Sequence, residues 1–219
     1  MLQFLLFVYG SCLGSFLCAA ASRYATHDSL LFPASHCDWC LTPLAYWQMV
    51  PGISYWWLRG RCAYCQFPIP PETIVTEFGC GLLLATWHHP LDTFMIGWLL
   101  LWIYAALCDL RTQTFPAWVG AASFIFVPHA PTFTTISLLL LAYGAIRLIW
   151  PRWPHPWLGD GDLEFISSYW IAWGSLATSR WLSTACLLAW LVHPPRLHQP
   201  FPFVPALVAS AWLWWVLLA

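Results

Sequence analysis

Long runs without a charged residue constrain the fold of this chain more than any other feature. Residues 1–22 and 197–219 contain no Asp, Glu, Lys or Arg, and about 20 apolar residues suffice to cross a bilayer. Only 8% of the 219 residues are charged, whereas a soluble domain usually carries about 25%. The chain lacks the charge to cover a water-facing surface, so we expect a helical membrane protein.

The apolar runs predict an all-α polytopic fold with about eight transmembrane helices. The expected crossings are 2–22, 73–90, 92–109, 114–129, 131–149, 163–179, 181–195 and 203–219. The fourth and fifth crossings are short, and they require the chain to reverse at the turn Pro128–Pro131. The predicted domains are a first transmembrane helix over 1–22, a cytoplasmic loop over 23–72 and a seven-helix membrane domain over 73–219.

The arginines predict the orientation of these helices. The chain has no Lys, so its eight Arg residues carry the whole positive-inside signal. An outside N-terminus places every arginine except Arg180 on the cytoplasmic side or at its edge. The first basic residue, Arg23, follows the first apolar run, and this order favours an uncleaved helix over a signal peptide.

The cytoplasmic loop carries two C-x-x-C pairs, formed by Cys37 with Cys40 and by Cys62 with Cys65. A two-residue gap lets both thiolates of a pair face one cation, and two such pairs complete a tetrahedral zinc site. Two disulfides are a competing interpretation, but they require an oxidising compartment. Free or redox-active thiols are a third. The predicted cytosolic location favours a structural zinc ion.

Two aspartates at predicted helix ends are the candidate catalytic pair. Asp109 follows an apolar run and ends the third expected crossing. Asp162 closes the motif Gly159-Asp160-Gly161-Asp162 at the start of the sixth expected crossing. Two carboxylates held close together share a proton, so one can deprotonate a water while the other polarises a peptide carbonyl. The alternative is structural: Asp109 pairs with Arg111, and Asp160 and Asp162 cap a helix.

The order of these motifs resembles the type IV prepilin peptidases, which include the competence and type II secretion leader peptidases. The similar elements are Gly14-Ser15-Phe16-Leu17 with Arg23, the C-x-x-C pairs flanking Pro51 and Gly60-Arg61, Glu77, Asp109 with Pro116, Gly159-Asp160-Gly161-Asp162, and Phe203-Val204-Pro205. The resemblance implies a GxGD-type aspartyl peptidase in which Asp109 and Asp162, rather than Asp160, are the catalytic residues.

Several positions depart from the pattern of that family, among them Thr73 and Ile74, which replace the usual Tyr-Pro before Glu77. Cys18 stands where Asn is usual, Ala117 where an acidic residue often follows the proline, and Val204 where Gly is common. Glu164 occupies a position that is usually Lys. This last replacement reverses a charge near the candidate active site.

The resemblance implies that the chain removes the short basic leader of prepilin-like precursors at the cytoplasmic face of a bacterial cytoplasmic membrane. Many members of the family also N-methylate the new N-terminus with S-adenosylmethionine, an activity tied to the cytoplasmic loop. No glycine-rich nucleotide motif supports binding of this cofactor independently. The implied partners are pilin or pseudopilin precursors and the lipid bilayer.

Three alternatives compete with this interpretation. An ion- or proton-coupled transporter would use Asp109 and Asp162 to bind cations, but transporters often show repeat symmetry, which we do not find. A zinc-anchored scaffold without enzymatic activity would depend on the cysteines alone. Another intramembrane GxGD protease is disfavoured by the cysteine loop. Nucleic acid is not an expected partner, because the net charge is −1 and no basic patch exists.

Overall fold

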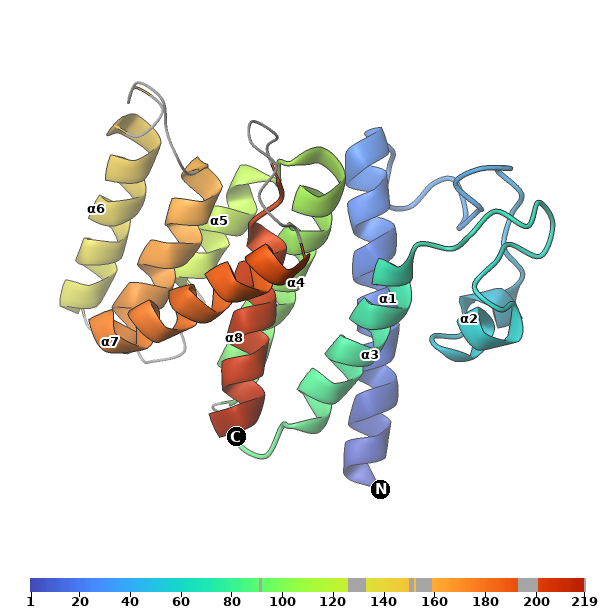
Figure 1. The fold of residues 1–219 in the computed structure, drawn as a ribbon, viewed down its shortest axis with the longest axis horizontal. Coiled ribbons are helices and arrows are strands. Elements are labelled where there is room, and N and C mark those ends of the chain that lie inside the picture. Colours follow the sequence, from blue (N-terminus) through green and yellow to red (C-terminus); the bar gives the residue numbers. More distant parts are fainter. Residues whose placement is uncertain (91, 126–132, 150–151, 153–158, 193–200, 219) are drawn as a thin grey trace. The chain divides into compact units, whose positions relative to one another are not determined.

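The computed structural model describes residues 1–90, 92–125, 133–149, 152, 159–192 and 201–218. Among these residues the regular secondary structure is helical, with loops and two isolated β-bridges between the helices, which confirms the predicted all-α class (Figure 1). The helices are α1 (Leu2–Thr26), the 3-10 helix η1 (Tyr46–Met49), α2 (Ile53–Trp57), α3 (Pro71–Ala85), α4 (Asp92–Thr112), α5 (Ala117–Ile125), α6 (Phe133–Ile149), α7 (Asp160–Val192) and α8 (Val204–Leu218). They form two compact units, Met1–His88 and His89–Ala219.

Two of the described helices, α1 and α4, are long and apolar enough to cross a membrane, and α8 is a shorter apolar helix. The presence of apolar spans agrees with the sequence-based expectation. The number of crossings, their orientation and the domain boundaries stay predictions. The predicted reversal at Pro128–Pro131 lies outside the described residues.

The helix α7 corrects one predicted boundary. The sequence predicts that one crossing ends at residue 179 and the next begins at 181, but α7 continues through Arg180. The helix is interrupted at Gly174 instead, where φ is 77° and ψ is 176°. Glycine reaches this region because it has no Cβ, whereas other residues rarely adopt such a φ. The charge of Arg180 was a misleading signal for the turn.

In the first unit, glycines bring α1 and α3 into close contact (Figure 1). A Cβ built at Gly14 would lie 2.7 Å from the carbonyl oxygen of Thr76, and one at Gly10 would overlap the carbonyl of Cys80. Small residues allow this approach of helix backbones, which supplies much of the packing between helices in a membrane. The α1–α3 pair therefore depends on positions that tolerate no side chain.

In the second unit, tryptophans link neighbouring helices through the core. The indole N–H of Trp98 on α4 donates to the carbonyl of Ser123 on α5, at 2.9 Å. The indole N–H of Trp181 on α7 donates to the carbonyl of Leu207 on α8, also at 2.9 Å. Both rings are fully buried. These tryptophans therefore hold the helices together by apolar packing and by a directed hydrogen bond.

The packing of α1 on α3 predicts that Gly14→Ala destabilises the protein. The added methyl group meets backbone atoms of α3, which cannot move aside locally, so we expect a loss of about 1–3 kcal/mol. Thermal unfolding of the purified protein in detergent measures this. Gly79→Ala, where nothing lies within 4 Å of the added Cβ, is the matched control. Equal midpoints for the two variants would contradict the close approach of α1 to α3.

Candidate functional site

The first C-x-x-C pair forms a tight turn in the loop between α1 and α3. The N–H of Cys37 donates to the carbonyl of Thr42 at 3.0 Å, and the N–H of Leu41 donates to the carbonyl of Cys37 at 2.9 Å. Leu41 has a left-handed φ of 56°, and an isolated bridge between His36 and Pro43 closes the turn. The turn thus directs both sulfurs of the pair to the same side.

The second pair repeats this turn. The N–H of Cys62 donates to the carbonyl of Phe67 at 2.9 Å, and the N–H of Gln66 donates to the carbonyl of Cys62 at 3.1 Å. Gln66 has a φ of 60°, and the closing bridge joins Arg61 to Pro68. Aligned on their cysteines, the two segments share the pattern C-x-aromatic-C-x-x-P. This short repeat, which is visible in the sequence but was not predicted from it, identifies the two halves of one site.

The two turns bring the four sulfurs together. The Sγ atoms of Cys37 and Cys65 lie 3.8 Å apart, those of Cys40 and Cys62 lie 4.0 Å apart, and all four lie within 4.8 Å of one another. Tetrahedral zinc with Zn–S bonds of about 2.3 Å requires S···S distances of about 3.8 Å. A disulfide needs about 2.05 Å, and all four residues are free thiols. The cluster fits a metal ion and is compatible with zinc.

The surroundings of the cluster favour ionised sulfur at one position and oppose it at another. Side-chain and backbone hydrogen bonds from Thr42 lower the pKa of Cys40 to about 6. At Cys65 the backbone amide of Phe67 lowers the pKa, but burial and the three neighbouring thiols outweigh it and raise the pKa to about 12. Four thiols this close do not ionise independently. A divalent cation would remove their mutual repulsion and stabilise the thiolates.

The first candidate aspartate, Asp109, lies in the last turn of α4 and is 7% exposed. Its Oδ2 accepts a hydrogen bond from the N–H of Val204 at 3.2 Å. Val204 is the first residue of α8, so the unpaired N–H groups and the positive end of that helix attract the carboxylate. Valine in place of the common glycine preserves this contact, because the donor is a backbone group.

The second candidate, Asp162, lies in the first turn of α7 and is partly exposed. Its Oδ2 accepts a hydrogen bond from the N–H of Gly159 at 3.2 Å, as a side chain in a first helical turn often does. The two glycines of the motif have different tasks. Gly159 lies against the Asp162 carboxylate, and Gly161 lies against the ring of Phe115, which a Cβ would overlap.

Aromatic pairs fix the register of α4 against α7. The ring centroids of Trp98 and Tyr169 lie 5.9 Å apart, and those of Trp102 and Phe165 lie 4.6 Å apart. Moving one turn forward on α4 therefore means moving one turn back on α7, so the two helices face each other in antiparallel directions.

By helical periodicity, this register predicts that the two aspartates lie on the facing sides of α4 and α7. Asp109 follows Trp102 by two helical turns and Asp162 precedes Tyr169 by two turns, so each shares the face of the aromatic pairs. Along the axis, Asp109 is offset from Asp162 by about one turn, or roughly 6 Å. Helical side chains tilt toward their own N-terminus, so in antiparallel helices these two carboxylates tilt toward each other.

The replacement of the usual lysine by Glu164 has a structural explanation. Glu164 on α7 is fully buried, and its Oε1 lies 2.9 Å from Nε of Arg147 on α6. Its other oxygen occupies the space beside Gly120 on α5, where any side chain would overlap it. Glu164 therefore ties three helices together close to Asp162. From the sequence, Arg147 was interpreted only as an orientation signal; in the structure it lies in the last turn of α6 and pairs with Glu164.

Comparisons with known proteins agree with the resemblance inferred from the motifs. Residues 8–90 match the family model for the bacterial peptidase A24 N-terminal domain. The chain is 26% identical, over 84% of its length, to the prepilin leader peptidase/N-methyltransferase of Neisseria gonorrhoeae, of which it covers 71%. It is 27% identical, over 94% of its length, to the protein of the same name from Bacillus subtilis (strain 168), of which it covers 91%. No solved structure matches the chain.

The cysteine cluster predicts about one zinc ion per purified chain and its loss in Cys62→Ser, because three thiolates leave the tetrahedral shell incomplete. Elemental analysis by mass spectrometry after gel filtration measures the metal content. Cys186→Ser, which removes an exposed cysteine outside the cluster, should retain the metal. Equal zinc in both variants, or a wild type without zinc after expression in zinc-supplemented medium, would contradict the assignment.

Proposed function

We propose that this chain, a relative of the prepilin leader peptidase/N-methyltransferases over most of its length, is a membrane aspartyl endopeptidase that removes the leader from prepilin-like precursors. The observation that carries the mechanism is the α4–α7 register, in which Asp109 and Asp162 share the faces of the aromatic pairs. The names of the relatives support the substrate class.

In the proposed mechanism the two aspartates hydrolyse the peptide bond without a covalent intermediate. Two nearby carboxylates cannot both ionise at low cost, so the pair holds one proton. The ionised carboxylate deprotonates a water molecule, which attacks the scissile carbonyl carbon. The protonated carboxylate donates a hydrogen bond to the carbonyl oxygen and stabilises the charge that develops there. The proton belongs to the pair, so neither residue is assigned a fixed role.

Backbone donors hold both carboxylates for this chemistry. The N–H of Val204 fixes one oxygen of Asp109, and the N–H of Gly159 fixes one oxygen of Asp162. Asp162 is more exposed than Asp109, so the precursor is expected to approach from the side of Asp162. Positioning of this kind lowers the barrier because the reacting groups need no rearrangement.

The proposed location is a bacterial cytoplasmic membrane with the N-terminus outside and the active site facing the cytoplasm. Arg23, Arg111 and Arg147 lie in the last turns of α1, α4 and α6. Since the three helices would each run inward, their C-terminal ends would share the cytoplasmic side, in agreement with the positive-inside rule.

Methylation of the new N-terminus is a second proposed activity. It is supported by the names of the relatives, which include N-methyltransferase, and by the retained cysteine loop. S-adenosylmethionine would supply the methyl group. The chain has no glycine-rich nucleotide motif, so no residue is assigned to this cofactor. Zinc is proposed to be structural and to hold the two turns of the loop together.

The first test is cleavage of a co-reconstituted prepilin-like precursor by wild type, Asp109→Asn and Asp162→Asn. Asparagine preserves the size of the side chain and an acceptor oxygen but cannot exchange the catalytic proton. We therefore expect each variant to lose at least about 100-fold in initial rate. The mass of the new N-terminus reports cleavage and also reveals an added methyl group.

The matched control is Asp92→Asn at the opposite end of α4, where the carboxylate accepts a hydrogen bond from the N–H of His89 at 2.8 Å. This variant should cleave at the wild-type rate. Cleavage that survives in Asp109→Asn or Asp162→Asn would refute the aspartyl mechanism. A wild type that cleaves none of several precursors would favour the transporter or scaffold alternatives.

The Arg147–Glu164 pair generates a separate prediction. Glu164→Lys places two cations in a buried site, and we expect it to cost about 3–5 kcal/mol of stability and most of the cleavage rate. The double exchange Arg147→Glu with Glu164→Lys restores opposite charges and should recover much of both. Thermal unfolding and the cleavage rate are measured on the same samples. A double variant no better than Glu164→Lys would argue against the ion pair, and the exposed Arg152→Glu should leave both quantities unchanged.

A further inference from the structure

The loop that carries the cysteines contains an uncharged stretch unlike the rest of it. Residues 39–58 include no Asp, Glu, Lys or Arg, although they lie within a segment predicted to be cytoplasmic. Two arginines, Arg59 and Arg61, follow directly. From residue 46 onward the stretch is rich in aromatic residues, namely Tyr46, Trp47, Tyr55, Trp56 and Trp57. Such a composition is typical of a segment in contact with lipid.

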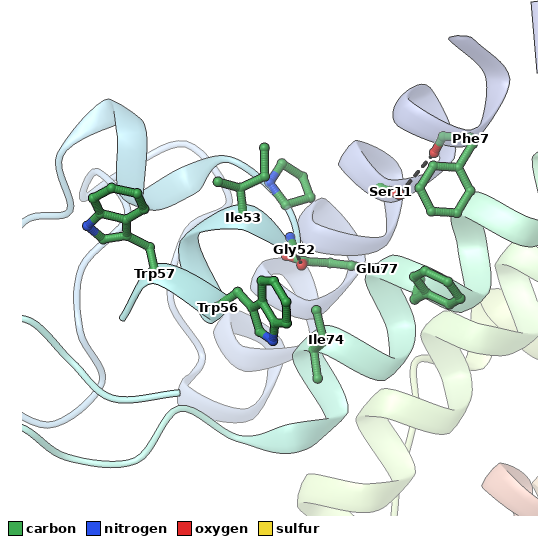
Figure 2. Close-up of a pocket in the computed structure, with 10 residues that line it drawn as sticks. Phe7, Ser11, Gly52, Ile53, Trp56, Trp57, Ile74 and Glu77 are labelled. Carbon is green, nitrogen blue, oxygen red and sulfur yellow. Dashed lines mark hydrogen bonds between the residues drawn. The ribbon is translucent and has the colours of Figure 1, made fainter. Parts of the chain in front are cut away.

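This stretch returns to the level of the middle of α1. The N–H of Gly52 donates to Oε2 of Glu77 on α3 at 2.7 Å (Figure 2). The Cα of Glu77 in turn lies 2.8 Å from the Cβ position of Gly14, the central residue of α1. Gly14 is about 18 Å from either end of that helix, and the hydrocarbon core of a bilayer is about 30 Å thick. A placement that centres the hydrocarbon near the middle of α1 therefore puts Gly52, which is one glutamate side chain away from Gly14, inside the hydrocarbon.

The backbone of the stretch is suited to an environment without water. In lipid, each unpaired N–H costs several kcal/mol, so irregular backbone at membrane depth must find partners within the protein. Within this stretch six N–H groups bond to carbonyls of residues 45–54, namely those of Gln48, Val50, Ile53, Ser54, Trp56 and Leu58. The N–H of Gly52 has no such carbonyl and uses the carboxylate of Glu77. This contact also gives the buried Glu77, 4% exposed, a structural role.

The side chains of the stretch point outward and border an apolar hollow. Ile53, Trp56 and Trp57 are 66%, 87% and 79% exposed. A pocket of about 460 Å³ lies between them and the helices, lined also by Phe7 of α1 and Ile74 of α3 (Figure 2). Large exposed apolar surfaces are rare on soluble proteins and mark contacts with a partner or a membrane. Here Phe7 of α1 lines the same pocket, and α1 is itself a candidate membrane span.

We propose that residues 46–58 form a re-entrant segment that inserts into the bilayer beside α1 and α3, and that the pocket holds an acyl chain of a phospholipid. Arg59 and Arg61 then lie at the headgroup level, where their long side chains reach phosphate groups. The hydrogen bond from Gly52 to Glu77 holds the tip of the segment inside the membrane. This proposal does not depend on peptidase activity.

The test labels the wild-type protein in nanodiscs whose phospholipids carry an aryl-diazirine halfway along one acyl chain. After irradiation and proteolysis, mass spectrometry locates the lipid adducts. The internal standard is the exposed face of α1 at Phe4 and Leu5. We expect residues 53–57 to be labelled to a similar extent as Phe4 and Leu5. Trp39 and Tyr64, the aromatic residues of the two cysteine turns, are 68% and 58% exposed. They should be labelled at least about tenfold less, because we expect the cysteine turns to lie outside the hydrocarbon.

Two variants connect the result to Glu77. Glu77→Gln keeps an acceptor for the N–H of Gly52 and should retain the wild-type labelling of residues 53–57. Glu77→Leu removes the acceptor, so labelling of residues 53–57 should fall relative to Phe4 and Leu5. Labelling of Phe4 and Leu5 without labelling of residues 53–57 in the wild type would overturn the proposal. Equal labelling of residues 53–57, Trp39 and Tyr64 would also overturn the proposal, because the segment would then lie no deeper in the membrane than the cysteine turns.

Discussion

The need of each buried polar group for a partner organises this protein. Three acidic side chains are buried in apolar surroundings, and each is stabilised by a different partner. Asp109 uses the N–H at the start of α8, Glu77 uses the N–H of Gly52, and Glu164 uses Arg147. In a bilayer, uncompensated charges and unpaired backbone groups are costly, so these contacts decide where helices begin and which helices meet. A charged residue in this chain thus marks a junction between elements.

The absence of a side chain makes several of these junctions possible. Gly120 leaves room for the Glu164 carboxylate, Gly161 leaves room for the ring of Phe115, and Gly14 lets α3 approach α1. At Gly120 the space left by the missing side chain holds the carboxylate that pairs with Arg147, and at Gly161 it holds an aromatic ring. For this reason the GxGD motif is best understood as two steric requirements followed by one functional group.

Local features were predictable from the sequence, and long-range contacts were not. The spacing of Cys37, Cys40, Cys62 and Cys65 indicated the cluster because a C-x-x-C turn is determined within a few residues. The candidate aspartates were recognised by their motifs, and their catalytic roles stay predictions. The interruption at Gly174 was missed because Arg180 interrupted the apolar pattern nearby. The partner of Glu164 was missed because pairing between α6 and α7 depends on tertiary packing, which periodicity does not encode.

The repeated cysteine turns have a topological consequence for the segment between them. Cys40 and Cys62 are the two ends of one excursion of the chain, and their sulfurs lie 4.0 Å apart. A metal ion bound by both turns would cross-link the two ends of the segment between Cys40 and Cys62. The segment would then begin and end at the metal site. Closing a loop of this length removes on the order of 3 kcal/mol of chain entropy from the open ensemble. The cation would therefore stabilise the conformation of the intervening segment by fixing its two ends, without contacting the residues in its middle.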